Sequence, residues 1–182
     1  MLIIQRTSEQ PQTISTFDFR NQKQLLNLMN IAILGYGYWG PNLLRNFNAT
    51  AGCTAYAVGD LSEEKLAKAQ KMVPSIKTTT DIDGLLTDTQ VDAVVIATPV
   101  DTHYPLAKKA LENGKHVLLE KPMTSSSEHA KELVELAQKH NKVLMVDHTF
   151  LYTGTVRKLK ELVDSGEVGK LTYLDSTRIN LG

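Results

Sequence analysis

The stretch that decides the fold is residues 30–44, which read NIAILGYGYWGPNLL. Its apolar first part is typical of a short buried strand, and a Gly-x-Gly-x-x-Gly turn follows directly. Gly35 allows the tight turn, Gly37 lets a phosphate approach the backbone, and Gly40 lets the next helix pack close to the sheet. The pattern predicts a strand, a turn and a helix whose first N–H groups face the pyrophosphate of a dinucleotide.

An acidic residue stands at the expected distance after this turn. A second strand-like run, residues 53–58, leads to Asp60, about 20 residues past the third glycine. A carboxylate at this strand tip is expected to accept hydrogen bonds from the adenosine ribose hydroxyls and to repel a 2′-phosphate. Because Leu61 and Ser62 follow, with no Arg or Lys directly after Asp60, NAD is favoured over NADP. The alternative is a structural turn with a surface aspartate.

The composition narrows the class of protein. The 182 residues suffice for one full domain and part of another, and 20 Lys and Arg balance 20 Asp and Glu. A chain without a basic field is not expected to bind nucleic acid or a membrane surface, so small molecules or other subunits are the predicted partners. The one cysteine, Cys53, lies in an apolar run and is expected to be a buried side chain.

Two further absences in the sequence lead to predictions. No apolar run approaches the length of a membrane span, and the N-terminus lacks the features of a signal peptide, which favours a cytoplasmic protein. The five histidines have no metal-ligand spacing, so no metal is expected.

Strand-like and helix-like segments alternate from residue 30 onward, which predicts a parallel sheet with right-handed crossovers. The predicted strands are residues 30–34, 53–58, 76–79, 91–97, 116–119 and 143–146. The predicted helices begin at the glycine turn and then cover residues 62–73, 81–86, 103–113 and 125–140, the last with a capping box of Ser125 and Glu128. Six strands in this series predict a doubly wound α/β sheet (Rossmann fold) of order 3-2-1-4-5-6.

The two ends of the chain differ from this central part. Residues 1–28 are rich in Gln, Ser, Thr and Asn, which predicts a poorly structured extension, with a short edge helix as the alternative. Residues 29–148 are the predicted NAD-binding domain. Residues 149–182 offer one helix (154–165) and one alternating strand (171–178), too little to bury a core. They predict the beginning of a truncated α+β substrate and oligomerisation domain.

Polar residues end several predicted strands, and the carboxyl ends of parallel strands share one edge of a sheet. In chain order these residues are Asp60, Thr98, Pro99, Glu120, Lys121, Pro122, Asp147 and His148. Polar groups that converge on one rim predict a binding site more strongly than any single motif does.

Four motifs together resemble a known family. They are Gly35 to Gly40 (GYGYWG), Ala97-Thr98-Pro99 with His103, Glu120-Lys121-Pro122, and the closing residues 178–182 (RINLG). This set resembles the Gfo/Idh/MocA family of NAD(P)-dependent oxidoreductases, and Glu-Lys-Pro is its most specific mark. Residues 38–43 and 147–152 are similar to members that oxidise nucleotide-linked sugars, such as UDP-N-acetylglucosamine-type 3-dehydrogenases.

The resemblance implies a role for Lys121, which matches the family lysine that polarises the substrate oxygen or takes its proton. The alternative is a surface lysine that neutralises Glu120. His103 is expected to make a cofactor or structural hydrogen bond, and Pro122 to fix its loop. The predicted cofactor-binding residues are Gly35, Tyr36, Gly37, Tyr38, Trp39, Gly40, Asp60, Thr98, Pro99, His103, Glu120 and Lys121. The predicted substrate-binding residues are Lys121, His148, Tyr152 and Arg178.

The predicted function is hydride transfer between NAD and a hydroxyl carbon of a sugar or nucleotide sugar. The family's second domain carries an Asp-x-x-x-His motif that these 182 residues do not contain. The alternative is therefore a dinucleotide-binding or subunit-interaction protein without turnover, and a homo-oligomer is expected for a full-length form.

Overall fold

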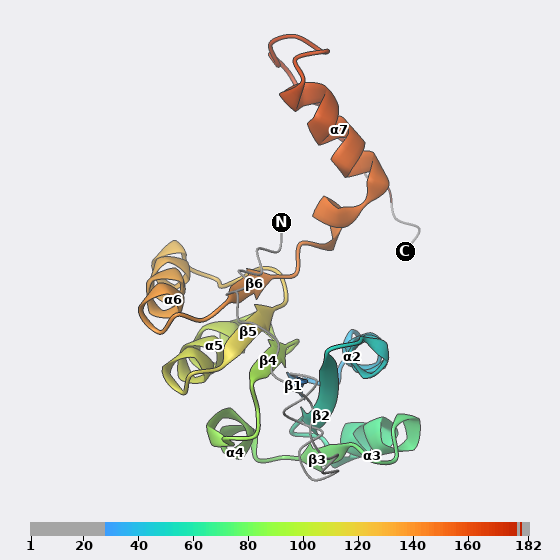
Figure 1. Cartoon of the computed structure of the whole chain (residues 1–182), viewed down its shortest axis with the longest axis vertical. Helices are drawn as coiled ribbons and strands as arrows, with labels where there is room; N and C mark the ends of the chain where they lie inside the picture. Colours follow the sequence, from blue (N-terminus) through green and yellow to red (C-terminus); the bar gives the residue numbers. More distant parts are fainter. Residues whose placement is uncertain (1–27, 178, 180–182) are drawn as a thin grey trace, which may run out of the picture.

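A computed structural model describes residues 28–177 and 179. Six parallel strands form one sheet in the order β3-β2-β1-β4-β5-β6 (Figure 1). The strands are β1 (Met29–Leu34), β2 (Cys53–Gly59), β3 (Lys77–Thr79), β4 (Ala93–Ile96), β5 (His116–Leu119) and β6 (Leu144–Val146). The doubly wound α/β fold predicted from the sequence is confirmed.

Helices cover both faces of this sheet. Figure 1 shows α2 and α3 on one side and α4, α5 and α6 on the other. Their bounds are α2 (Gly40–Ala49), α3 (Glu63–Met72), α4 (Ile82–Thr87), α5 (His103–Glu112) and α6 (Ser127–Lys139). Each parallel crossover carries a helix back across the sheet, so every strand ends at the same rim.

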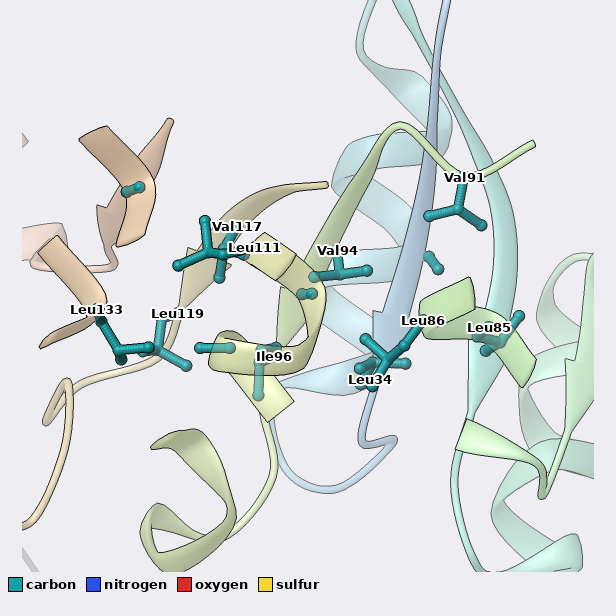
Figure 2. Close-up of a cluster of buried hydrophobic side chains, with 14 of the residues drawn as sticks. Leu34, Leu85, Leu86, Val91, Val94, Ile96, Leu111, Val117, Leu119 and Leu133 are labelled. Atoms are coloured by element: carbon teal, nitrogen blue, oxygen red, sulfur yellow. The ribbon is translucent and has the colours of Figure 1, made fainter. Parts of the chain in front are cut away.

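The alternation of side chains along the central strands divides the core into two clusters. In β1, Leu34 belongs to the cluster that includes residues of α4, α5 and α6, whereas Ile33 belongs to the cluster that includes residues of α2 and α3. β4 divides in the same way between Ile96 and Val95. Figure 2 shows the first cluster, in which Leu34, Leu86, Ile96, Leu111, Leu119 and Leu133 are fully buried. Burial on both faces explains why these strands read as nearly continuous apolar runs.

The structure confirms the predicted N-cap of one helix and corrects the predicted N-cap of another. Ser62 caps α3, because its Oγ accepts a hydrogen bond from the N–H of Lys65. At α6 the predicted cap, Ser125, was wrong by one residue. Ser126 takes the extended cap conformation, accepts from the N–H of His129 and donates its hydroxyl to Glu128. Two adjacent serines offer the same capping group, and backbone conformation selects between them.

The chain after β6 lies apart from the sheet (Figure 1). A short 3-10 helix (Thr149–Tyr152) leads into α7 (Gly154–Asp164), so the helix predicted there is confirmed. The strand predicted over residues 171–178 was wrong for residues 171–177, which are exposed and have no regular secondary structure. A strand needs a neighbour for its backbone hydrogen bonds, and this segment is not part of the sheet.

Several predictions on the chain ends remain predictions. Residues 1–27 and Arg178 lie outside the described part of the chain. The division into domains after residues 28 and 148 also stays a prediction. Among the helices formed by residues 28–177, none combines the length and the apolar character that crossing a lipid bilayer requires.

Leu34→Ala tests the central position of β1. Leu34 has no exposed surface and lies in the larger apolar cluster. Removing most of its side chain should lower the free energy of unfolding by about 2–5 kcal/mol, measured by urea denaturation. The control is Leu159→Ala on α7, where the side chain is 49% exposed and a change within about 0.5 kcal/mol is expected. Equal losses for both variants would contradict the assignment of the core.

Candidate functional site

A cleft of about 860 Å³ opens where β1, β2 and β4 end, a volume typical of small-molecule sites. Loops after these strands and the start of α5 form its walls. The lining residues include Gly35, Gly37, Tyr38, Trp39, Gly59, Asp60, Ser62, Lys65, Ala97, Thr98, Pro99 and Thr102. Seven residues predicted from the sequence to bind the cofactor are among them: Gly35, Gly37, Tyr38, Trp39, Asp60, Thr98 and Pro99.

The glycine turn fits tightly between the two neighbouring strands. Gly35 has a φ of 92°, its N–H donates to the carbonyl of Gly59, and a Cβ there would come within 2.5 Å of the Ala97 carbonyl oxygen. At Gly37 a Cβ would meet nothing within 4 Å. The backbone at Gly37 is therefore open toward the cleft. At Gly40 a Cβ would come within 2.8 Å of the Tyr36 ring, so this glycine lets α2 begin beside that ring.

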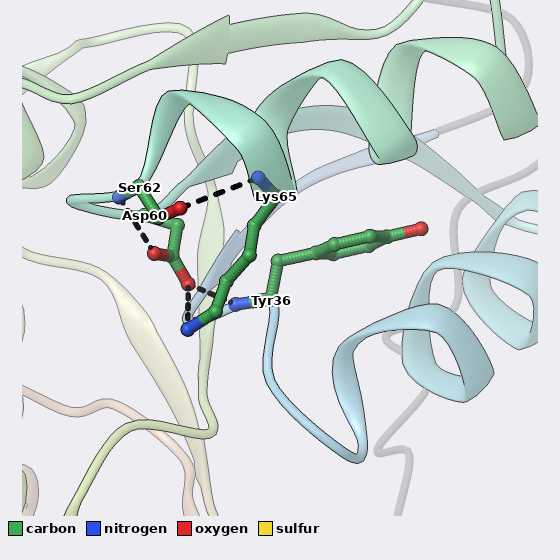
Figure 3. A network of polar contacts seen from close by, with 4 residues as sticks. All are labelled: Tyr36, Asp60, Ser62 and Lys65. Carbon is green, nitrogen blue, oxygen red and sulfur yellow. Dashed lines mark hydrogen bonds and ion pairs between the residues drawn. The ribbon is translucent and has the colours of Figure 1, made fainter.

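Asp60 holds this turn from the end of β2 (Figure 3). One carboxylate oxygen accepts the N–H of Tyr36 at 2.7 Å, and the other accepts the N–H of Ser62 at 2.9 Å. The ammonium of Lys65 lies 3.4 Å from the first oxygen. Burial alone would raise the pKa of Asp60, but these three donors outweigh burial and hold the pKa below its ordinary value. The carboxylate is thus a fixed negative charge in the cleft wall.

A carboxylate offers about four acceptor positions, and three donors already occupy part of that capacity at Asp60. The side chain remains in the cleft lining, so it can still accept one hydrogen bond from a ligand. The sequence predicted Asp60 as a contact for two ribose hydroxyls. The structure adds a second task for the same group, which is holding the glycine turn.

The aromatic residues of the turn differ in position. The ring of Tyr36 is buried among apolar residues of α2 and α3, so only its backbone N–H belongs to the site. Tyr38 and Trp39 are exposed at the cleft, with their rings edge to face at 5.2 Å between centroids. Tyr38 and Trp39 can therefore meet a ligand directly, whereas Tyr36 and Gly40 lie behind the wall.

His103 lies beneath the cleft rather than in its lining. It is 1% exposed, and its ring nitrogens lie 2.9 Å from the carbonyl oxygens of Thr98 and Pro122. A neutral imidazole can donate to one of these carbonyls only. The ring joins the loop after β4 to the loop after β5, so it supports the cleft wall through the residues that it holds.

Three of the predicted catalytic and substrate residues, Lys121, His148 and Tyr152, follow the ends of β5 and β6 and are not among those lining the cleft, and Arg178 lies outside the described residues. Glu120 follows Leu119 of β5, and Asp147 follows Val146 of β6, and Leu119 pairs with Val146 in the sheet. Burial, together with the nearby Asp147 carboxylate, raises the pKa of Glu120. The N–H of Lys121 donates to Glu120, the Lys121–Pro122 peptide bond is cis, and Lys121 is exposed. His148 and Tyr152 are also exposed, and the guanidinium of Arg157 lies over the Tyr152 ring.

Lys65 is the charged residue of the described cleft lining that the sequence prediction missed. It lies five residues after Asp60, and only the residues directly after Asp60 were considered for a cation. The sequence still held a signal for its position, because Ser62 is the N-cap of α3 and Lys65 is therefore the third residue of that helix. Side chains in a helix point back toward its N-terminus. The side chain of Lys65 therefore points toward Asp60, which lies just before the helix begins.

Within residues 28–177, no group of three or more His, Cys, Asp or Glu side chains is placed to hold a metal ion. Among the described residues that line the cleft, the charged groups are one carboxylate, of Asp60, and one ammonium, of Lys65, and the hydroxyl-bearing residues are Tyr38, Ser62, Thr98 and Thr102. A glycine turn, a strand-end carboxylate and a cleft at the carboxyl ends of a doubly wound sheet define a dinucleotide-binding Rossmann protein.

The comparison with family models names the family. The model of the GFO_IDH_MocA family, described as an oxidoreductase family with an NAD-binding Rossmann fold, matches residues 29–148. The chain belongs to this Gfo/Idh/MocA oxidoreductase family, as the resemblance of its motifs predicted.

Relatives with different named activities match most of the chain. Inositol 2-dehydrogenase 2 of Saccharopolyspora erythraea is 32% identical over 85% of the chain and 46% of its own length. 2,7-anhydro-N-acetylneuraminate hydratase of Mediterraneibacter gnavus is 33% identical over 84% of the chain and 40% of its own length. The scyllo-inositol dehydrogenase of Lactobacillus casei, solved with NAD(H) and scyllo-inositol, superposes with a TM-score of 0.74 at 26% identity. That match covers 80% of this chain and 43% of the other. The chain thus spans less than half the length of these relatives.

Gly35→Ala should destabilise the fold, because the new methyl group would meet the Ala97 carbonyl in a backbone conformation that favours glycine. We expect a loss of more than about 1 kcal/mol in the free energy of unfolding, measured by urea denaturation. Gly37→Ala, where a Cβ meets nothing within 4 Å, is the matched variant and should unfold at the wild-type urea concentration. A Gly35→Ala variant as stable as Gly37→Ala would contradict this account of the turn.

Glu120→Gln should raise the melting temperature at neutral pH. Because the pKa of Glu120 is raised, its ionisation opposes folding above that pKa, and glutamine removes the charge. Below the ordinary carboxyl pKa the glutamate is protonated in both states, so the advantage should disappear. Thermal melts from about pH 3 to about pH 8 check this, with Glu135→Gln on the exposed side of α6 as control. An advantage independent of pH would contradict the prediction.

Proposed function

We propose that the chain is the NAD-binding part of an oxidoreductase that transfers a hydride between nicotinamide and a hydroxyl-bearing carbon. The observation that carries this proposal is one cleft bordered by the open backbone of Gly37 and the ionised carboxylate of Asp60. The family membership and the named activity of the Saccharopolyspora and Lactobacillus relatives favour a polyhydroxylated substrate: an inositol, a sugar or a nucleotide sugar.

The residues of the cleft fit a dinucleotide in a definite direction. The backbone at Gly37 and the start of α2 suit the pyrophosphate, since no side chain intervenes and unpaired N–H groups of the helix end there. The remaining acceptor capacity of Asp60 suits a hydroxyl of the adenosine ribose. Thr98 and Pro99 form the wall along which the cofactor extends toward the ends of β4 and β5. An ionised Asp60 favours NAD over NADP, because it repels a 2′-phosphate.

The residues at the ends of β5 and β6 are proposed to accept the proton that the substrate hydroxyl loses. Nicotinamide, when bound, supplies the acceptor for the hydride. Lys121 is the proposed acceptor of the hydroxyl proton, and the hydrogen bond from its N–H to Glu120 fixes its backbone at the strand end. His103 holds the two loops on which Thr98 and Pro122 lie, so it positions the cofactor wall relative to Lys121.

Cofactor binding is tested by calorimetric titration of the 182-residue chain with NAD. Wild type should bind, and Gly37→Ala should weaken binding at least about tenfold without changing the melting temperature, because its methyl group would occupy the place of a phosphate oxygen. Gly154→Ala on α7, also a glycine with open space, is the control and should bind as wild type does. No heat on adding NAD, or wild-type affinity of Gly37→Ala, would contradict the cofactor site.

Turnover is tested by following NADH absorbance with inositols, free sugars and nucleotide sugars. If the chain oxidises one of them, Lys121→Ala should abolish turnover while NAD affinity stays within about twofold of wild type. Lys139→Ala, an exposed lysine at the end of α6, is the control and should leave turnover unchanged. A chain that binds NAD and oxidises none of these compounds supports the alternative of a dinucleotide-binding protein without turnover.

A further inference from the structure

We propose that Lys65 sets the cofactor selectivity of the cleft, by offsetting the charge of Asp60 and binding a ribose 2′-phosphate, so that NADP is accepted beside the favoured NAD. The inference rests on the proposed function of the cleft as a dinucleotide site. It concerns a residue that neither the family match nor the fingerprint motif assigns.

The position of Lys65 brings its ammonium to the ribose end of the cleft. Lys65 lies in the first turn of α3, and its Nζ is 3.4 Å from the carboxylate of Asp60 (Figure 3). Both side chains line the cleft, and they are the charged residues among those described in its lining. A ligand group that contacts Asp60 therefore lies within reach of Lys65.

The contact between the two charges is loose enough to be exchanged for a ligand. At 3.4 Å it is longer than the 2.7–2.9 Å usual for an ammonium on a carboxylate. The backbone N–H groups of Tyr36 and Ser62 hold Asp60 at 2.7 and 2.9 Å, so the carboxylate keeps its place without the lysine. Lys65 is 45% exposed, against 9% for Asp60, which leaves its ammonium room to turn toward an incoming phosphate.

The charge arrangement predicts selectivity that is graded rather than absolute. An isolated carboxylate at this strand tip repels a 2′-phosphate. Here an ammonium lies beside the carboxylate, so a phosphate close to both is repelled by Asp60 and attracted by Lys65. Lys68, three residues further along α3, pairs with Glu64 at 2.7 Å and is not part of the cleft lining. Lys65 is thus the cation of the described lining that a 2′-phosphate can reach.

The test is calorimetric titration of wild type and of Lys65 variants with NAD and with NADP. Lys65→Ala should weaken NADP binding about tenfold, the value of one lost charge-assisted hydrogen bond, and change NAD binding less than about twofold. Lys65→Arg keeps the positive charge and should retain most of the NADP affinity, which separates a lost contact from a damaged fold. Lys68→Ala on the same helix is the matched control and should bind both cofactors as wild type does.

Each remaining outcome has a definite meaning. Equal weakening of NAD and NADP in Lys65→Ala, or the same loss of NADP binding in Lys68→Ala, would overturn the selectivity role. Wild type that binds NAD but shows no heat with NADP would also overturn it, and would leave the proposed cofactor site intact. Wild type that binds neither cofactor would remove both proposals, which distinguishes the two kinds of failure.

Discussion

The hydrogen bond from the N–H of Tyr36 to the carboxylate of Asp60 is the contact on which the cleft depends. It joins the turn after β1 to the end of β2, while the Ala97 carbonyl closes the other side of that turn against Gly35. Three strand ends, far apart in sequence, are thereby fixed within contact of each other at one rim. The open backbone of Gly37 is useful to a ligand only because its neighbours in the turn are held in this way.

The sequence predicted the fold because its signals are local and agree with each other. Apolar strands buried on both faces, a glycine turn and capped helices each occupy a few consecutive residues, and together they allow one sheet order. The errors fall where the deciding factor is not local. Ser125 and Ser126 are chemically equal as caps. Residues 171–177 alternate as a strand does, but pairing requires a neighbour that their own sequence does not supply.

The residues of the site were also predicted only in part. Motifs identified residues that belong together, yet they did not separate side chains that line the cleft from those that support it. His103 and Tyr36 are buried and act through the groups they hold, whereas Tyr38 and Trp39 are exposed in the cleft wall. Lys65 was missed for the opposite reason. No motif contains it, and only the direction of a side chain in the first turn of α3 brings it to Asp60.

The part of the rim around the glycine turn is more buried and more fully hydrogen-bonded than the part at the ends of β5 and β6. Around the glycine turn, polar groups are buried or paired and the backbone is held from both sides. At the ends of β5 and β6, Lys121, His148 and Tyr152 are exposed and lie outside the cleft lining. One fold can carry different reactions when the groups at one edge of it differ. In keeping with this, relatives named as a dehydrogenase and as a hydratase match this chain at nearly equal identity, 32% and 33%.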